Sequence, residues 1–219
     1  MQSFHVAELR IGTIGSVAHA GGTVRTAIAK RRVPGPLELG PLGFQGDTVA
    51  DTEHHGGPEK AVCVYAAARY PLWERDLGAP LKRPAFGENL LVDGVVEEDV
   101  RVGDVVAIGT TVVAVSQPRV PCYVPAAYTG HKQLTVDLRR TGWTGWYLRV
   151  LEPGQVAEGD VATVVERVAG AWSVAELNAV RYAAVPDREA LRAAAATPAL
   201  NASWREALQR LAEGGRDDE

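Results

Sequence analysis

Cysteine is scarce in this chain: only two of its 219 residues are cysteines, and no pairing pattern connects them. Two thiols cannot complete a four-thiolate zinc site, and they cannot hold an iron–sulfur cluster without help from another chain. Unpaired cysteines also suit a reducing compartment better than an oxidising one. This scarcity favours a cytoplasmic protein and excludes an iron–sulfur centre held by this chain alone.

The sequence also lacks a long apolar run and an excess of basic charge. No apolar segment is long enough to cross a bilayer, and Met1-Gln2-Ser3-Phe4-His5 lacks the charged-then-apolar pattern of a secretory signal. The 23 basic and 27 acidic residues give a formal net charge of −4, without a long basic stretch. This balance argues against a sequence-independent nucleic-acid binder. We therefore expect a cytoplasmic protein with neither a membrane nor a nucleic-acid partner.

What the sequence does contain is a long β-rich region. From Phe4 to about Val168, short runs of valine, isoleucine and threonine alternate with glycine and proline, which predicts many short strands. Such spacing is typical of a barrel or a sandwich, and we favour a barrel. The predicted elements are strands over 26–33, 61–65, 89–92, 145–151 and 161–168, a hairpin over 105–115 that turns at Gly109-Thr110, and a helix over 66–77 interrupted near Pro71.

Beyond residue 172 the pattern changes to helix. Ser173 and Ser203 are each followed three residues later by a glutamate, which is the spacing of a capping box. Asp187 can cap a helix between them. The predicted helices cover 174–183, 188–196 and 204–213. We therefore divide the chain into a β-barrel domain over 1–168 and a three-helix extension with a tail over 169–219.

One segment combines chemistry with stiffness: Ser116-Gln117-Pro118-Arg119-Val120-Pro121-Cys122. Its two prolines oppose regular ladder pairing, so we expect a rigid, irregular loop on a strand scaffold, where binding chemistry concentrates. A guanidinium favours the thiolate form of a nearby thiol, and a thiolate is both a nucleophile and a soft metal ligand. Cys63 lies in an apolar run and has the pattern of a core residue. For Cys122, the residues alone leave chemical and packing roles open.

A second segment has groups that suit a ligand: His54-His55-Gly56-Gly57-Pro58-Glu59-Lys60. Its two glycines let backbone amides approach a ligand closely, and His55 and Lys60 flank them with donors. Adjacent histidines diverge in extended structure. A zinc site made from His54, His55, His131 and Cys122 is therefore disfavoured, although the residues leave it open.

Two further glycine-containing segments come before strands or turns. Gly43-Phe44-Gln45-Gly46-Asp47 is typical of a plain turn, and we favour that interpretation. Phe86-Gly87-Glu88-Asn89-Leu90 places an amide at a strand entry. The Asn89 amide offers a donor and an acceptor, as a pterin or purine edge requires, but a local hydrogen bond in a turn explains it equally well.

Taken in order, these segments resemble the MOSC domain family, named for the C-terminal domain of molybdenum cofactor sulfurase. Each segment is weak singly, while their order and spacing together are specific. The similarity covers roughly residues 10–212, and the helical end resembles the three-helix extension of small bacterial members, which include reductases of N-hydroxylated purines. The matching segments are 43–47, 55–58, 86–90, 102–104, 116–122, 141–147 and 153–154.

The resemblance implies a mainly β protein whose barrel holds the molybdenum cofactor, a molybdopterin. It implies that Cys122 is both the metal ligand and the catalytic residue, through its thiolate. We expect Cys122, Arg119, His55 and Asn89 to line one cleft at the barrel's mouth. The predicted cofactor-binding residues are Arg119, His55, Gly56, Gly57, Lys60, Asn89, Ser116 and Gln117.

The activity implied by the resemblance is reduction of N-hydroxylated bases or related N-oxygenated small molecules. The sequence shows neither the iron–sulfur module nor the full-length N-terminal partner domain of longer members, so we expect a separate electron-donor protein, a flavin reductase or a ferredoxin-like carrier. One alternative is a non-catalytic carrier of the cofactor, or of sulfur on Cys122. Another is a hydrolase with Cys122 as nucleophile and His55 as base. The oligomeric state stays open.

Overall fold

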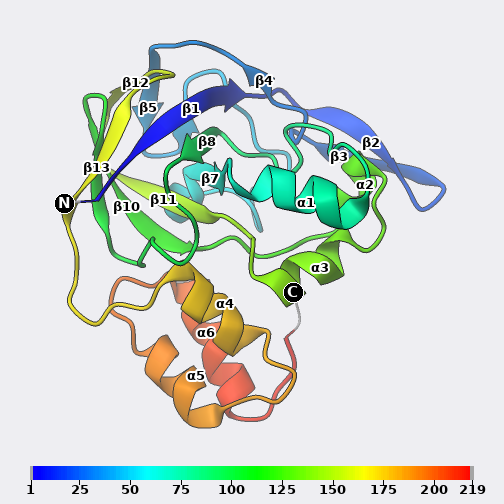
Figure 1. Ribbon diagram of the computed structural model, residues 1–219, viewed down its shortest axis with the longest axis vertical. Coiled ribbons are helices and arrows are strands. Elements are labelled where there is room, and N and C mark those ends of the chain that lie inside the picture. The colour runs from blue at the N-terminus through cyan, green and yellow to red at the C-terminus, as the bar shows by residue number, and fades with distance from the viewer. Residues whose placement is uncertain (1, 218–219) are drawn as a thin grey trace.

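The computed structural model describes residues 2–217, and within that range strands dominate the fold (Figure 1). Seven strands of this region close a barrel in the order β13-β9-β10-β11-β7-β8-β1, because β1 pairs with both β8 and β13. Only the β7–β8 pair among these described strands is parallel. The barrel strands are β1 (Ser3–Ile11), β7 (Val62–Ala66), β8 (Leu90–Asp93), β9 (Val105–Ile108), β10 (Thr111–Pro118), β11 (Trp146–Glu152) and β13 (Val161–Glu166). The predicted mainly β barrel is confirmed.

Shorter strands extend the barrel at its rim. β4 (Arg31–Arg32) pairs with the end of β1, while β2 (Gly15–His19) and β3 (Gly22–Thr26) form a hairpin that projects from the barrel (Figure 1). A separate small sheet consists of β12 (Gly154–Val156), β5 (Leu37–Gly40) and β6 (Gly43–Phe44). The predicted β9–β10 hairpin turning at Gly109-Thr110 is confirmed, since Thr111 pairs with Ile108.

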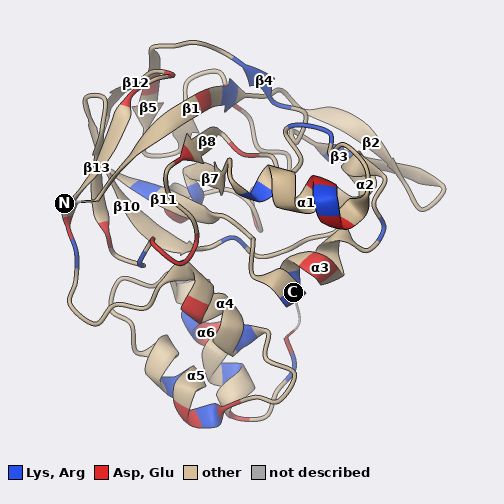
Figure 2. Cartoon of the chain, in the orientation of Figure 1, with Lys and Arg blue, Asp and Glu red and all other residues tan. Residues whose placement is uncertain are grey.

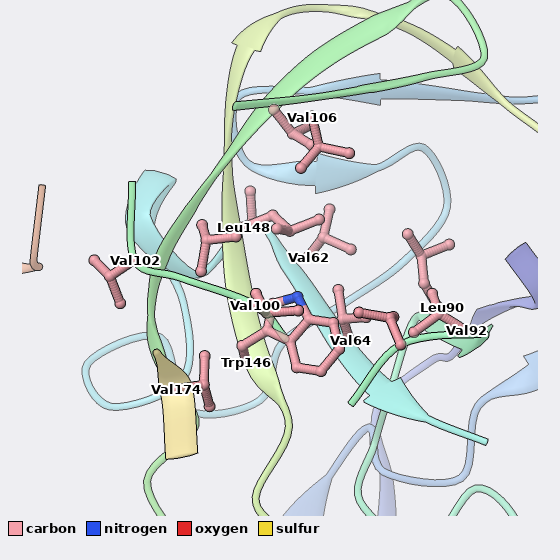
Figure 3. Packing of buried hydrophobic residues seen from close by; sticks show 14 of the residues in the cluster. Val62, Val64, Leu90, Val92, Val100, Val102, Val106, Trp146, Leu148 and Val174 are labelled. Carbon is pink, nitrogen blue, oxygen red and sulfur yellow. The ribbon is translucent and has the colours of Figure 1, made fainter. Parts of the chain in front are cut away.

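The barrel interior is filled by aliphatic side chains packed around a tryptophan. Trp146 of β11 is 1% exposed and lies at the centre of this cluster (Figure 3). Its labelled neighbours in the cluster are Val62, Val64, Leu90, Val92, Val100, Val102, Val106, Leu148 and Val174. Val174 begins α4, so the barrel core continues into the helical region. Burial of each such side chain contributes roughly 1.5–3 kcal/mol, which stabilises the strands that carry the site.

A second apolar cluster lies beneath α1 (Arg69–Leu77) and fixes the loop that enters β8. Phe86 stacks on Tyr65 with ring centroids 4.0 Å apart, and Trp73 donates its Nε1–H to the Tyr65 hydroxyl at 2.6 Å. The predicted interruption at Pro71 is wrong. Pro71 is the third residue of α1, in the first turn, where a backbone N–H has no helical acceptor and its loss costs little.

The three predicted C-terminal helices are present as α4 (Val174–Arg181), α5 (Arg188–Ala195) and α6 (Ala202–Ala212). The capping box of α4 is confirmed: Ser173 Oγ accepts from the Glu176 N–H at 3.1 Å, and Glu176 Oε2 accepts from the Ser173 N–H at 2.7 Å. Asp187 caps α5, also as predicted. The predicted cap at Ser203 is wrong, because α6 begins earlier and Asn201 Oδ1 accepts the Ser203 N–H at 2.7 Å.

Two strand predictions near the barrel mouth are also wrong. β3 ends at Thr26, and residues 27–30 turn into the barrel mouth instead of continuing as a strand. β10 continues as far as Pro118, which pairs with Trp146, so the irregular loop begins at Arg119. A register shift between Val115 and Gln117 accommodates this extension. The sequence analysis also missed two short helices, α2 (Val124–Thr129) and α3 (Leu134–Thr141).

Basic and acidic residues are interspersed along the helices and loops that face the viewer in Figure 2. In α1, for example, Glu74 and Asp76 flank Arg75. A search of residues 2–217 finds no helix with the length and hydropathy needed to cross a bilayer.

Candidate functional site

A cavity of about 350 Å³ opens at the barrel mouth, where segments far apart in the sequence meet. Residues 24–30, 47–57, 86–89 and 119–125 each contribute to its wall, although not every residue of these ranges does so. The side chains of Cys122, Arg119, His55 and Asn89 all line this one cavity, which confirms the predicted cleft. Their convergence is produced by the barrel, because β7 and β8 begin at this rim and β10 ends there.

Arg119 and Cys122 form the chemical centre of the cavity. Arg119 Nη2 donates to the Sγ atom of Cys122 at 3.9 Å, and the guanidinium is only 4% exposed. Nη1 has no hydrogen-bond partner among residues 2–217, and no carboxylate in that range forms an ion pair with Arg119. A buried cation whose second nitrogen is unpaired is costly, so this geometry favours an anionic occupant.

The groups around Arg119 do not neutralise it near pH 7. Burial lowers the pKa of Arg119, whereas Cys122, Tyr147, Cys63 and Tyr65 raise it, and the net direction is upward. Burial, however, raises the pKa of Cys63 to about 12 and raises the pKa values of Tyr147 and Tyr65. These three groups are therefore neutral near pH 7. The positive charge of the Arg119 guanidinium can therefore interact with the Cys122 sulfur and with any anion that the cavity binds.

His55 is a neutral base in this site. Burial, followed by the charge of Arg119, lowers the pKa of His55 to about 4. Its neighbour His54 is exposed, and its Nδ1 lies 3.0 Å from Asp51 Oδ2. The two adjacent histidines thus have different surroundings, and only His55 lines the cavity. Near pH 7 its imidazole can donate or accept a hydrogen bond without adding a second cation beside Arg119.

The pKa of His55 predicts a pH-dependent stability. An unfolded histidine binds a proton near pH 6.5, whereas His55 in the folded protein binds one near pH 4. Between these values the unfolded state holds more protons, so stability rises with pH. The stabilisation is complete above pH 6.5, and about 3 kcal/mol is lost by pH 4. Between pH 7 and pH 4, the free energy of unfolding measured in urea should fall by about 3 kcal/mol more for the wild type than for His55→Gln. Parallel losses would contradict the assignment of a neutral His55.

Backbone groups of the neighbouring loop complete this side of the cavity. Gly57 has φ 92° at the entry to the 3₁₀ helix η1 (Pro58–Lys60), a conformation that favours glycine. A Cβ added at Gly56 would approach the Cα and carbonyl oxygen of Thr52 to 3.1 Å. Lys60 Nζ donates to the His54 carbonyl at 2.6 Å. His55, Gly56, Gly57 and Lys60 all line the cavity, so the predicted loop faces the ligand space.

Asn89 has a structural network instead of a free edge. Its Oδ1 accepts from the Cys63 N–H at 3.1 Å, and its Nδ2 donates to the Arg10 carbonyl at 3.2 Å and to Asp47 Oδ2 at 2.8 Å. Both amide hydrogens are therefore used within the protein. The predicted contact with a pterin edge would require one of these bonds to break, so Asn89 supports the cavity floor.

Ser116 and Gln117 do not line the cavity, in contrast to the prediction that they bind the cofactor. Both residues are 0% exposed. The Ser116 hydroxyl lies 2.5 Å from the Glu59 carbonyl and 3.1 Å from the Tyr147 carbonyl, and Gln117 Nε2 donates to the Pro118 carbonyl at 3.2 Å. Because β10 continues through this segment, the two side chains pack inside the protein, and the Ser116 hydroxyl links β10 to η1 and β11.

The sequence analysis missed a buried ion pair in the cavity. Lys30 Nζ lies 2.6 Å from both carboxylate oxygens of Asp47, and Asp47 Oδ1 also accepts the Gly12 N–H at 2.7 Å. Asp47 ends the segment 43–47, for which the sequence favours a plain turn. Its carboxylate is the one sequence feature there that could have indicated a partner for a buried cation. Lys30 lay within a strand that does not form. Among the described residues, the charged groups lining the cavity are the cations Arg25, Lys30, Lys60 and Arg119 and the carboxylates Asp47 and Asp51.

These groups fit an anionic ligand that carries a soft metal. The cavity is cationic on balance although the whole chain has a formal charge of −4. It presents a thiol, a guanidinium, a neutral imidazole and glycine amides. Within residues 2–217, no group of three or more His, Cys, Asp and Glu side chains is placed to hold a metal ion. A thiolate suits a soft metal, and guanidinium and amide donors suit phosphate or other oxyanions.

Fold and site define a β-barrel protein with a cysteine-containing, cationic cavity at its mouth and a helical extension. The model of the MOSC domain family matches residues 51–163, and that of the YiiM-like, 3-alpha helix domain matches residues 172–215. The chain belongs to the MOSC domain family, and its C-terminal region is the YiiM-like three-helix domain.

Relatives of similar length support this assignment. Uncharacterized protein YflK of Bacillus subtilis (strain 168) is 40% identical over 204 residues, covering 93% of this chain and 92% of YflK. Protein YiiM of Escherichia coli (strain K12) is 34% identical over 194 residues, covering 87% and 86%. The crystal structure of YiiM from Geobacillus stearothermophilus superposes with a TM-score of 0.79 at 33% identity, covering 94% and 98%.

A longer relative has a name that states a class of activity. A protein of Gibberella moniliformis (strain M3125 / FGSC 7600) named "Reductase" is 33% identical over 183 residues. These residues cover 79% of this chain but 31% of the fungal protein, so the fungal protein has extensive sequence outside the shared region.

Proposed function

We propose that this protein is a molybdenum-cofactor-dependent reductase of N-hydroxylated bases or related N-oxygenated compounds. Membership of the MOSC family and the similarity to a fungal protein named "Reductase" support an oxidoreductase. The observation that carries the proposal is the buried Arg119 guanidinium beside Cys122, with Nη1 unpaired among the described residues. A soft thiolate ligand and an unpaired donor for an anion meet there, as a metal held in an anionic cofactor requires.

Each side chain has a separate task in this proposal. Cys122 would bind the metal as a thiolate, and Arg119 would stabilise that thiolate while Nη1 donates to an anionic oxygen of the cofactor. The backbone amides of Gly56 and Gly57, with Lys60, would receive a terminal phosphate. When bound, the cofactor would supply the two-electron chemistry that removes oxygen from nitrogen. The protein positions the reactants and limits the access of water.

The overall reaction sets what the site must provide. Reducing an N-hydroxylamine to an amine consumes two electrons and two protons and releases one water. His55 is neutral near pH 7, so it can accept or donate a hydrogen bond at the N–OH group without repelling Arg119. The buried Lys30–Asp47 pair keeps its charges within the cavity wall, where its hydrogen bonds to Gly12 and Asn89 fix the loop.

Metal analysis combined with turnover tests this function. The protein is produced in a molybdate-fed host, and its molybdenum content is measured together with reduction of 6-hydroxylaminopurine by reduced viologen. The proposal expects both molybdenum and turnover. Molybdenum without turnover would indicate the carrier alternative, and a metal-free protein with thiol-dependent hydrolysis would indicate the hydrolase alternative.

The electron supply gives a further prediction. The sequence has two cysteines and no Gly-x-Gly-x-x-Gly motif, so it offers neither a cluster site nor a dinucleotide-binding fingerprint. The cofactor-loaded protein should therefore be inactive with NADH or NADPH alone and active with reduced viologen or with an added flavin reductase. Sustained turnover with NADPH and no second protein would contradict this prediction and would point to another redox site on this chain.

A further inference from the structure

The ring of Tyr123 lies at the cavity beside the proposed metal ligand. Tyr123 directly follows Cys122, lines the same cavity and remains 47% exposed. The imidazole of His19 packs against it, with ring centroids 4.6 Å apart and an angle of 30° between the ring planes. Because His19 covers one side of the ring, the exposed surface belongs to the other side and to the edge.

The hairpin that supplies His19 holds this ring in place. His19 ends β2, and the turn that follows has positive φ at Ala20 (49°) and Gly21 (79°), as a two-residue hairpin turn requires. The hairpin packs against α2, whose first residue, Val124, follows Tyr123. Figure 1 shows the hairpin reaching over the α2 end of the barrel. A phenol ring supported on one side loses little conformational freedom when a ligand contacts the other side.

Apolar side chains line the same cavity as Tyr123 and Arg119. Ile28 and Phe86 line it as buried side chains, and Leu42 lines it while 75% exposed. Tyr123 and Leu42 are thus large apolar groups left accessible at a single cavity. Exposed aromatic and aliphatic groups at a cavity are typical of a site for a flat, weakly polar ligand.

We propose that Tyr123 is the stacking platform for the planar ring of the substrate and makes the site prefer planar N-hydroxylated heteroaromatic bases over aliphatic hydroxylamines. That the base is a substrate rests on the proposed function, whereas stacking of the base on Tyr123 can be measured without any reaction. An aromatic ring binds a heterocyclic base through its π face, and an aliphatic hydroxylamine has no such face. Tyr123 would therefore determine specificity without taking part in the chemical step.

The test is calorimetric titration of 6-hydroxylaminopurine into the purified protein, beside steady-state reduction with reduced viologen. Tyr123→Ala should weaken base binding about tenfold, as loss of one stacking ring does. Tyr123→Phe, which keeps the ring, should bind as the wild type does. Tyr128→Ala is the matched control, because Tyr128 lies in α2, the helix that directly follows Tyr123, contacts Lys82 and does not line this cavity. Its affinity for the base should be unchanged.

The outcomes separate this inference from the proposed function. Tyr123-dependent binding without turnover would support the platform and contradict the reductase. Turnover with equal affinities in wild type and Tyr123→Ala would overturn the platform and leave the reductase standing. Equal losses in Tyr123→Ala and Tyr123→Phe would also overturn the platform, because a stacking contact needs the ring and not the hydroxyl. A wild type that does not bind the base would overturn both.

Discussion

Cys122→Ser should lower the rate of N-reduction at least about a hundredfold, while the barrel stays folded. Loss of a residue that only hydrogen-bonds to a metal ligand already lowers activity by about ten- to a hundredfold, so loss of the ligand itself should cost at least the upper value. Serine replaces a soft, ionisable ligand with a hydroxyl that stays protonated near pH 7 and binds soft metals poorly. The variant should also retain far less molybdenum than the wild type. Cys122 is partly exposed at the cavity, so the change removes no core packing. Turnover, molybdenum content and circular dichroism measure the three effects.

Cys63→Ser is the matched control for this prediction. Cys63 lies in β7, is 6% exposed, and burial raises the pKa of its thiol to about 12. A hydroxyl there should cost about 1–3 kcal/mol of stability, because burial at the cavity floor desolvates it. Activity per folded molecule should remain. If both variants lose activity in proportion to their unfolding, Cys122 is a packing residue and the cofactor proposal fails.

Arg119→Met should have two opposite effects, weaker cofactor retention and higher stability of the cofactor-free protein. The guanidinium is buried without a carboxylate partner among residues 2–217, and its Nη1 is unpaired there. Replacing it with an apolar side chain of similar length removes a desolvated charge, which should stabilise the empty fold by about 1–2 kcal/mol. The same change removes the donor for the anion, so molybdenum content should fall at least about tenfold. Urea unfolding and metal analysis measure the two effects.

Arg25→Met provides the comparison for Arg119→Met. Arg25 lines the same cavity but is exposed. Both variants lose one positive charge, and only in Arg119→Met is the lost charge a buried one. The exposed change should alter stability by less than about 0.5 kcal/mol. Added inorganic phosphate should raise the unfolding temperature of the wild type more than that of Arg119→Met. An Arg119→Met protein that is less stable than the wild type yet keeps its metal would show that Arg119 is structural.

Local sequence signals were sufficient to predict the features that depend only on residues close together in the sequence. The capping box at Ser173, the cap at Asp187 and the turn at Gly109-Thr110 each involve residues within a few positions, and all three form as predicted. Local composition also predicted that Cys63 is a buried residue, which the structure confirms, although Cys63 lines the cavity as Cys122 does. The same reasoning failed at Ser203, where a competing cap two residues earlier had the better geometry.

The sequence by itself determined the order of a β region and a helical region, the turn and cap positions, and the chemical character of the segments that contain His55 and Cys122. Only the tertiary structure decided which groups share the cavity. Lys30 and Asp47 are 17 residues apart and meet because the fold brings two loops together at the barrel mouth. Ser116 and Gln117 lie inside the protein because β10 continues through them and is covered on both faces there, as the unbroken burial of residues 113–118 shows. Register and closure depend on pairing between distant strands, and no local pattern encodes them.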